Sequence, residues 1–311
     1  MLEALARGLC VAVAAALMVS LLARLALGRL RSCTQQPAGP LCVGDSLRGA
    51  AALLASAVGA ALGLVAAVGP TGITFGQRWE WLTLLPAVLA LPLLITALAF
   101  ASRVQFSMLT VGIVAAGAAR LGTPAIVEGG TFYAALVGGA AAWLWRGDQL
   151  QSPDRPAVRT PSVTLPTTAA VLLMSASVVF WSSGFGKLSV YCAALSVAAP
   201  AAAIAIGSAG SAAAVGRAAR VTAIVAAAVG MHYVGADFPR SSLVLLLSAP
   251  FAARAIGTAA AAAVQPAPGE AEPHATEARI RGVVEIACVT AAASAAAGIA
   301  MRHWRSLGGE L

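Results

Sequence analysis

The chain has 311 residues, of which 59% are hydrophobic and 10% are charged, with a mean hydropathy of +0.86. A soluble domain carries about a quarter charged residues, so this composition excludes a water-soluble globular protein and indicates lipid as the solvent for most of the surface. The net charge of +8 comes mostly from arginines at the ends of apolar segments. Lipid headgroups and the positive-inside bias explain that placement, so no nucleic acid partner is expected.

The apolar residues fall into ten segments that we predict to be membrane helices. These segments span about 4–27, 49–68, 81–101, 103–120, 131–145, 163–181, 188–206, 218–234, 241–264 and 282–301. Continuous apolar blocks without a two-residue alternation predict an all-α polytopic bundle rather than a barrel. The fifth segment is short for a span, so the fourth and fifth can instead form one broken or re-entrant pair, which would give nine spans.

Two polar stretches, about 146–166 and 265–281, are rich in proline and charge and are too short to form a core of their own. The sequence therefore predicts a single integral membrane domain over residues 1–311, without a sizeable soluble domain. A faint similarity between the residues after Val68-Gly69 and those after Val229-Gly230 leaves open two duplicated halves, 1–146 and 163–305.

The sidedness of the membrane helices has two conflicting indications. More positive residues lie in the connections after odd-numbered segments than on the other side, which by the positive-inside rule puts both termini outside. However, Cys33 and Cys42 flank a short turn and are the pair placed to form a disulfide, which would need the oxidising side of the membrane. The arginine-rich, lysine-poor composition is typical of a GC-rich genome, so we expect a multi-pass protein of a bacterial inner membrane.

One candidate polar site is Glu128, because ionisable groups at membrane depth are costly and tend to be functional. It lies between Thr123-Pro124 and Gly129-Gly130, where unwound backbone carbonyls could join the carboxylate around a cation or a proton. The alternative is an ordinary carboxylate in a loop at the interface.

A second candidate site combines His232 and Asp237. The histidine could titrate near neutral pH, and the aspartate could pair with it or with Arg240. The alternative is an interfacial His-Tyr pair followed by a loop.

Glu285 is explained by an ion pair with Arg281, four residues earlier. The chain has no catalytic, cofactor-binding or metal-binding motif, so none of these sites is expected.

The sequence therefore predicts a permease-like transporter in which Glu128 and Asp237 couple to a cation or a proton. One alternative is a non-catalytic structural or assembly subunit of a membrane complex, which suits small-residue spacings such as Gly59-x-x-x-Gly63. Another is a lipid-handling enzyme that places arginines on headgroup phosphates. The expected partners are membrane lipids, and other membrane subunits or a second copy of the chain.

Overall fold

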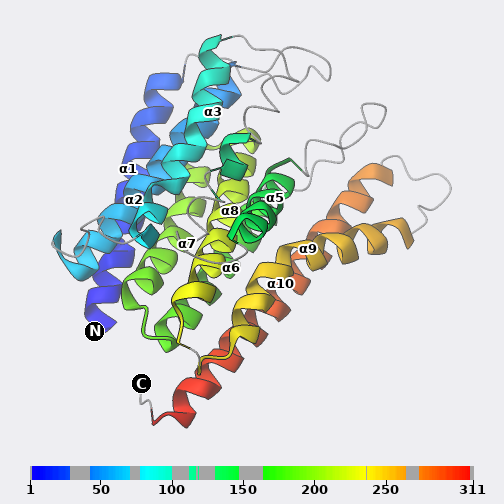
Figure 1. The fold of residues 1–311 in the computed structure, drawn as a ribbon. Coiled ribbons are helices and arrows are strands. Elements are labelled where there is room, and N and C mark those ends of the chain that lie inside the picture. The colour runs from blue at the N-terminus through cyan, green and yellow to red at the C-terminus, as the bar shows by residue number, and fades with distance from the viewer. Residues whose placement is uncertain are drawn as a thin grey trace.

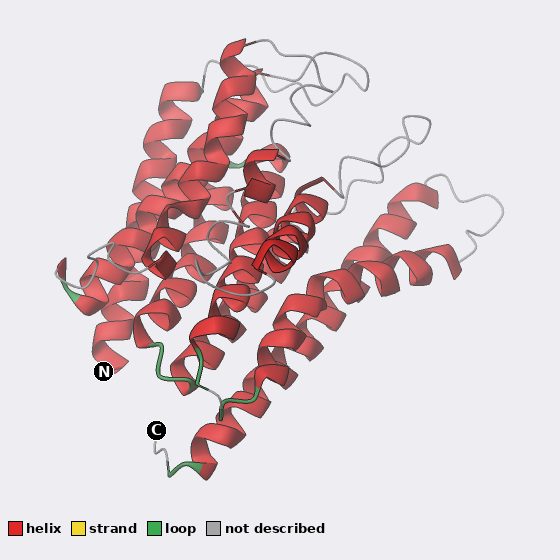
Figure 2. Ribbon diagram, in the orientation of Figure 1, coloured by secondary structure: helices red, strands yellow, loops and turns green. Residues whose placement is uncertain are grey.

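The computed structural model describes residues 2–28, 43–70, 78–99, 112–116, 118, 130–146, 164–235, 237–263 and 273–308. Every regular element in these ranges is a helix, which confirms the predicted all-α fold (Figure 2). The elements are α1 (Leu2–Leu27), α2 (Val43–Val68), the 3₁₀-helix η2 (Arg78–Leu84), α3 (Leu85–Ala99), α5 (Gly130–Arg146), α6 (Thr164–Ser182), α7 (Gly186–Ile206), α8 (Ala209–Tyr233), α9 (Arg240–Ala263) and α10 (Pro273–Ser306).

Seven of the described helices are long and apolar enough to cross a bilayer, namely α1, α2 and α6 to α10. Two further apolar helices, over 80–95 and 134–144, are shorter. The predicted polytopic membrane bundle is therefore confirmed. Most of the predicted fourth segment, 103–120, lies outside the described residues, so the choice between nine and ten spans stays a prediction.

Helix α8 lies at the centre of the bundle. It packs against α2, α3, α5, α6, α7 and α9, and 89% of its most apolar window is buried, compared with 22% for α1. The outer helices present large apolar side chains instead, such as Met18, Leu22 and Leu25 of α1, which are more than half exposed. A bundle whose outer surface is apolar and whose central helix is enclosed is the arrangement expected in lipid.

Small residues allow α1 and α2 to approach closely. A Cβ atom on Gly59 would lie 2.6 Å from the carbonyl oxygen of Ala12, and one on Gly63 would lie 2.7 Å from that of Gly8. The close helix approach predicted by the Gly59-x-x-x-Gly63 spacing is confirmed. The contact is within one chain, so these faces of α1 and α2 are covered by each other.

The predicted start of the eighth span was wrong by nine residues. Helix α8 begins at Ala209 rather than near 218, after Ser208, whose hydroxyl accepts a hydrogen bond from the backbone N–H of Ser211 at 3.0 Å. The predicted start leaves Arg217 outside the span and Arg220 in its first turn, because charges usually mark the ends of spans. An N-cap serine and a run of alanines favour helix here, so both arginines lie well inside α8.

The second polar stretch is also shorter than predicted. Helix α10 begins at Pro273 rather than near 282, so the residues from 273 to 281 are helical and not part of a loop. Proline is favoured in the first turn of a helix because its missing N–H is not needed there. As a result Arg281 and Glu285 are on the same continuous helix.

The helices alternate in direction, and Figure 1 shows how this orders the two ends of the bundle. Both chain termini lie at one end, together with the short connections from α6 to α7 and from α8 to α9. Helices α6, α8 and α10 begin at the opposite end, which we call the α6 end. Helices α9 and α10 form an antiparallel hairpin that packs mainly on α6 and α8.

Candidate functional site

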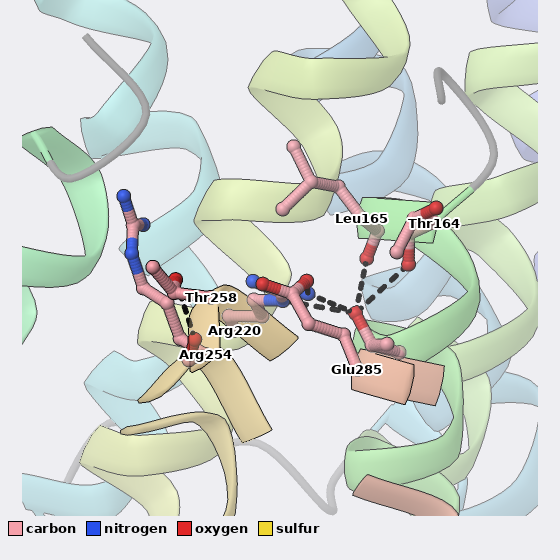
Figure 3. Close-up of polar contacts among 7 residues, drawn as sticks. Thr164, Leu165, Arg220, Arg254, Thr258 and Glu285 are labelled. Atoms are coloured by element: carbon pink, nitrogen blue, oxygen red, sulfur yellow. Dashed lines mark hydrogen bonds and ion pairs between the residues drawn. The ribbon is translucent and has the colours of Figure 1, made fainter. Parts of the chain in front are cut away.

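A buried ion pair joins the central helix to the α9–α10 hairpin. Nη2 of Arg220 on α8 lies 3.4 Å from Oε2 of Glu285 on α10, and each side chain is only 6% exposed (Figure 3). Arg220 also donates hydrogen bonds from Nε, at 2.9 Å, and from Nη2 to the hydroxyl of Thr168 on α6. One guanidinium group therefore links three helices.

Thr168 is oriented to accept these hydrogen bonds. Its hydroxyl lies 2.9 Å from the carbonyl oxygen of Thr164 and 3.1 Å from that of Leu165, one turn earlier on α6. A hydroxyl has one proton and two lone pairs, so donation to either carbonyl leaves the lone pairs for Arg220. Since Thr168 is itself buried, the start of α6 provides a fixed acceptor for the guanidinium.

Two glycines allow the helices to meet around this pair. A Cβ atom on Gly216 of α8 would lie 2.6 Å from Cβ of Leu165 and 2.8 Å from the backbone nitrogen of Pro166. On α9, a Cβ atom on Gly257 would lie 3.2 Å from Cγ of Glu285. Both sides of the ion pair therefore depend on a position without a side chain.

The ion pair lies within helices that are long enough to cross the membrane. The 19 residues of α6 rise about 28 Å, close to the roughly 30 Å thickness of the hydrocarbon layer. Arg220 and Glu285 lie inside α8 and α10, which are also long and apolar enough to span it. A paired arginine and glutamate inside such helices are costly to desolvate, and such groups in membrane proteins usually belong to substrate or ion pathways.

Further charged side chains lie one turn from the pair on α8 and α10. Arg217 precedes Arg220 by one turn on α8, and Arg281 precedes Glu285 by one turn on α10. A Cβ atom on Gly257 would also lie 3.3 Å from Cγ of Arg281, so the stems of Arg281 and Glu285 both lie against α9. Glu277 lies one turn before Arg281 on α10, so the described residues around the pair carry charges of both signs.

The structure places the sequence-predicted polar residues elsewhere. His232 is half-buried in the last turn of α8, about 18 Å farther along the helix from Arg220, and Asp237 is exposed in the connection to α9. Glu128, Cys33 and Cys42 lie outside the described residues. The roles predicted for these five residues stay predictions.

Sequence reasoning missed the roles of Arg220 and Thr168. It assigned Glu285 to its neighbour Arg281, whereas the structure also gives it a partner 65 positions away. The available signal was the pair of arginines three residues apart in an alanine-rich stretch without proline, which argues for charges inside a helix. The partner helices are not deducible from spacing, because the contact crosses three separate segments.

Comparisons with protein-family models, with curated proteins and with solved structures find no match to this chain. The buried pair is therefore the feature from which a function can be inferred.

The Thr168 hydroxyl can be tested by an isosteric change. We expect Thr168→Val to lower the free energy of unfolding by about 1–3 kcal/mol, because it removes the acceptor that faces a buried guanidinium. Thr258→Val is the matched control, since that exposed hydroxyl only returns to the carbonyl of Arg254 in its own helix. Equal unfolding free energies for the two variants in detergent would show that the Arg220–Thr168 hydrogen bonds are not stabilising.

Proposed function

We propose that the protein is a membrane carrier for a small anion. In this proposal Arg220 is the anion-binding residue, and Glu285 occupies it when no substrate is bound. The main support is the buried Arg220–Glu285 pair, which lies inside the membrane-spanning helices α8 and α10. Guanidinium groups are well suited to the task because their planar set of donors matches oxyanions.

The exchange of partners needs a place for the displaced carboxylate. An anion that enters competes with Glu285 for Arg220, and Arg281, one turn away on α10, gives the carboxylate a second cation. Neither charge is then left buried and unpaired, which would cost several kcal/mol. Because Glu285 is on the α9–α10 hairpin, release of the pair loosens one link between the hairpin and α8.

The contact distances also support this division of roles. The ion pair between Arg220 and Glu285 measures 3.4 Å, whereas the hydrogen bond from Nε of Arg220 to Thr168 measures 2.9 Å. Thr168 holds the guanidinium in place through a neutral contact, while the longer contact to Glu285 is the one that an anion can replace. A neutral acceptor does not compete electrostatically with an incoming oxyanion.

Transport can be tested on purified protein in liposomes by solid-supported membrane electrophysiology. Concentration jumps of phosphate, sulfate or acetate are the probes. We expect the wild-type protein to give a saturable current with at least one of them. Glu285→Gln should lower the half-saturating concentration about tenfold and slow turnover, because the anion no longer competes with a carboxylate for Arg220.

The double variant Arg220→Met/Glu285→Leu removes both charges and should give no anion current while remaining folded. Arg302→Gln, an exposed arginine near the other end of α10, is the control and should behave as wild type. Folded wild-type protein that gives no current with any of the three anions would overturn the proposal. So would equal half-saturating concentrations for the wild type and Glu285→Gln.

A further inference from the structure

A groove opens between α5 and α9 on the outside of the bundle. It has a volume of about 660 Å³, and its walls are Ala135, Leu136, Gly139, Ala140 and Trp143 of α5 and Phe251 of α9. This volume is in the range of sites that hold small ligands. Helix α5 packs on α8, and the contact with α9 runs through the Trp143 and Phe251 rings, whose centroids are 5.1 Å apart.

The walls of the groove are accessible from outside the bundle. Leu136 is 56% exposed and Trp143 is 44% exposed. A Cβ atom on Gly139 would meet no atom within 4 Å, so the backbone of α5 is open at this point. Because α9 is long and apolar enough to cross the membrane, the medium at this face is hydrocarbon, and the natural occupant is an alkyl chain.

The cationic side chain of Arg254 lies beside the groove. Cζ of Arg254, one turn along α9 from Phe251, is 5.0 Å from the centroid of the Trp143 ring, within the range of a cation–π contact. The same tryptophan is therefore both a wall of the groove and a platform for the guanidinium. Figure 3 shows that Arg254 points away from the Arg220–Glu285 pair, so its guanidinium serves a different place from the buried site.

We propose that this groove binds an anionic phospholipid, with one acyl chain between α5 and α9 and the phosphate on Arg254 above Trp143. The apolar walls suit the chain, and the planar guanidinium suits two oxygens of a phosphate. Basic side chains between membrane helices commonly bind anionic headgroups in this way. The proposal is independent of anion transport, because it uses neither Arg220 nor Glu285.

Native mass spectrometry of the purified full chain can measure this binding. Phosphatidylglycerol and phosphatidylcholine with identical acyl chains are the probes. They differ only in the headgroup, which carries a net negative charge in phosphatidylglycerol and none in phosphatidylcholine. We expect the wild type to bind phosphatidylglycerol about fivefold more tightly. Arg254→Gln should remove that preference and leave phosphatidylcholine binding unchanged, whereas Arg302→Gln, at an exposed position on α10, should keep it.

Filling the groove gives a second, independent readout. Gly139→Leu should reduce the binding of both lipids, while Gly298→Leu, at another open helical position, should not. If Gly139→Leu fails to fold, Arg254→Gln still decides the headgroup part. Equal affinity of the wild type for the two lipids would overturn the proposal. A change from dimer to monomer in Gly139→Leu, with lipid binding unchanged, would show instead that a second copy covers the groove.

Discussion

We expect Arg220→Met to lower the free energy of unfolding by about 3–5 kcal/mol, the largest effect of any single change considered. The variant leaves Glu285 buried without its cross-helix partner and leaves the Thr168 hydroxyl without its donors. The double variant Arg220→Met/Glu285→Leu removes both charges and replaces them with apolar groups. We expect it to recover most of the loss, because a buried ion pair is often no more stable than a well-packed apolar pair.

This pattern can be measured by equilibrium unfolding in mixed detergent micelles. The control is the exposed pair Arg7–Glu3 in the first turns of α1, whose side chains are 63% and 87% exposed. Arg7→Met should change the unfolding free energy by less than about 1 kcal/mol, because water screens such pairs. If Arg220→Met lowers the free energy of unfolding no more than Arg7→Met does, the buried pair does not stabilise the packing of the hairpin on α8. If the double variant is no more stable than Arg220→Met, the buried carboxylate of Glu285 is not the reason for the loss.

The recovery of the double variant also separates stability from function. A pair kept only for stability could be replaced by apolar residues without consequence for activity. A pair kept for anion exchange could not, because the folded double variant has no guanidinium to bind the substrate. The same two substitutions therefore answer a structural and a functional question in separate assays.

The helical bundle was predictable because hydrophobic length dominates it. A run of about 20 apolar residues has few structural options in lipid, and the starts of α6, α7 and α9 fall within two residues of their predicted positions. The starts were wrong by six residues at α2 and by nine at α8 and α10, where arginines were taken as the ends of spans. The usual inference from charge fails where a charge is paired inside the bundle, as it is for Arg220.

The candidate site was less predictable than the fold. Arg220, Thr168 and Glu285 are on three helices, and none of them follows a motif. Their meeting depends on Gly216 and Gly257, two of the 31 glycines in the chain, and nothing local to either marks it as a helix contact. Periodicity shows which residues share a face of one helix, but it does not show which helix that face meets.

The second large effect is expected at Gly216, the position that brings α8 onto the start of α6. In Gly216→Ala the new Cβ would lie 2.6 Å from Cβ of Leu165, 2.7 Å from its carbonyl carbon and 2.8 Å from the backbone nitrogen of Pro166. Two of these three atoms are backbone, so a change of rotamer cannot relieve the contact and α6 must move. We expect a loss of about 1–3 kcal/mol in the free energy of unfolding, even though alanine is the better helix former.

Gly298→Ala is the matched control, because that glycine is also inside a helix and its Cβ would meet no atom within 4 Å. It should stabilise the protein by about 0.5–1 kcal/mol. If the two alanine variants have the same stability, the close packing of α8 on α6 is not required.

The link between this packing and the ion pair can be measured by adding Thr168→Val to each background. If α6 moves in Gly216→Ala, Arg220 has already lost its acceptor in that variant. Thr168→Val should then lower the free energy of unfolding less in the Gly216→Ala background than in the wild type. Strict additivity would mean that Arg220 follows α6 when it shifts. The position of the Arg220 guanidinium would then be set by its hydrogen bonds to α6 rather than by its own helix α8. The anion site would then move with α6.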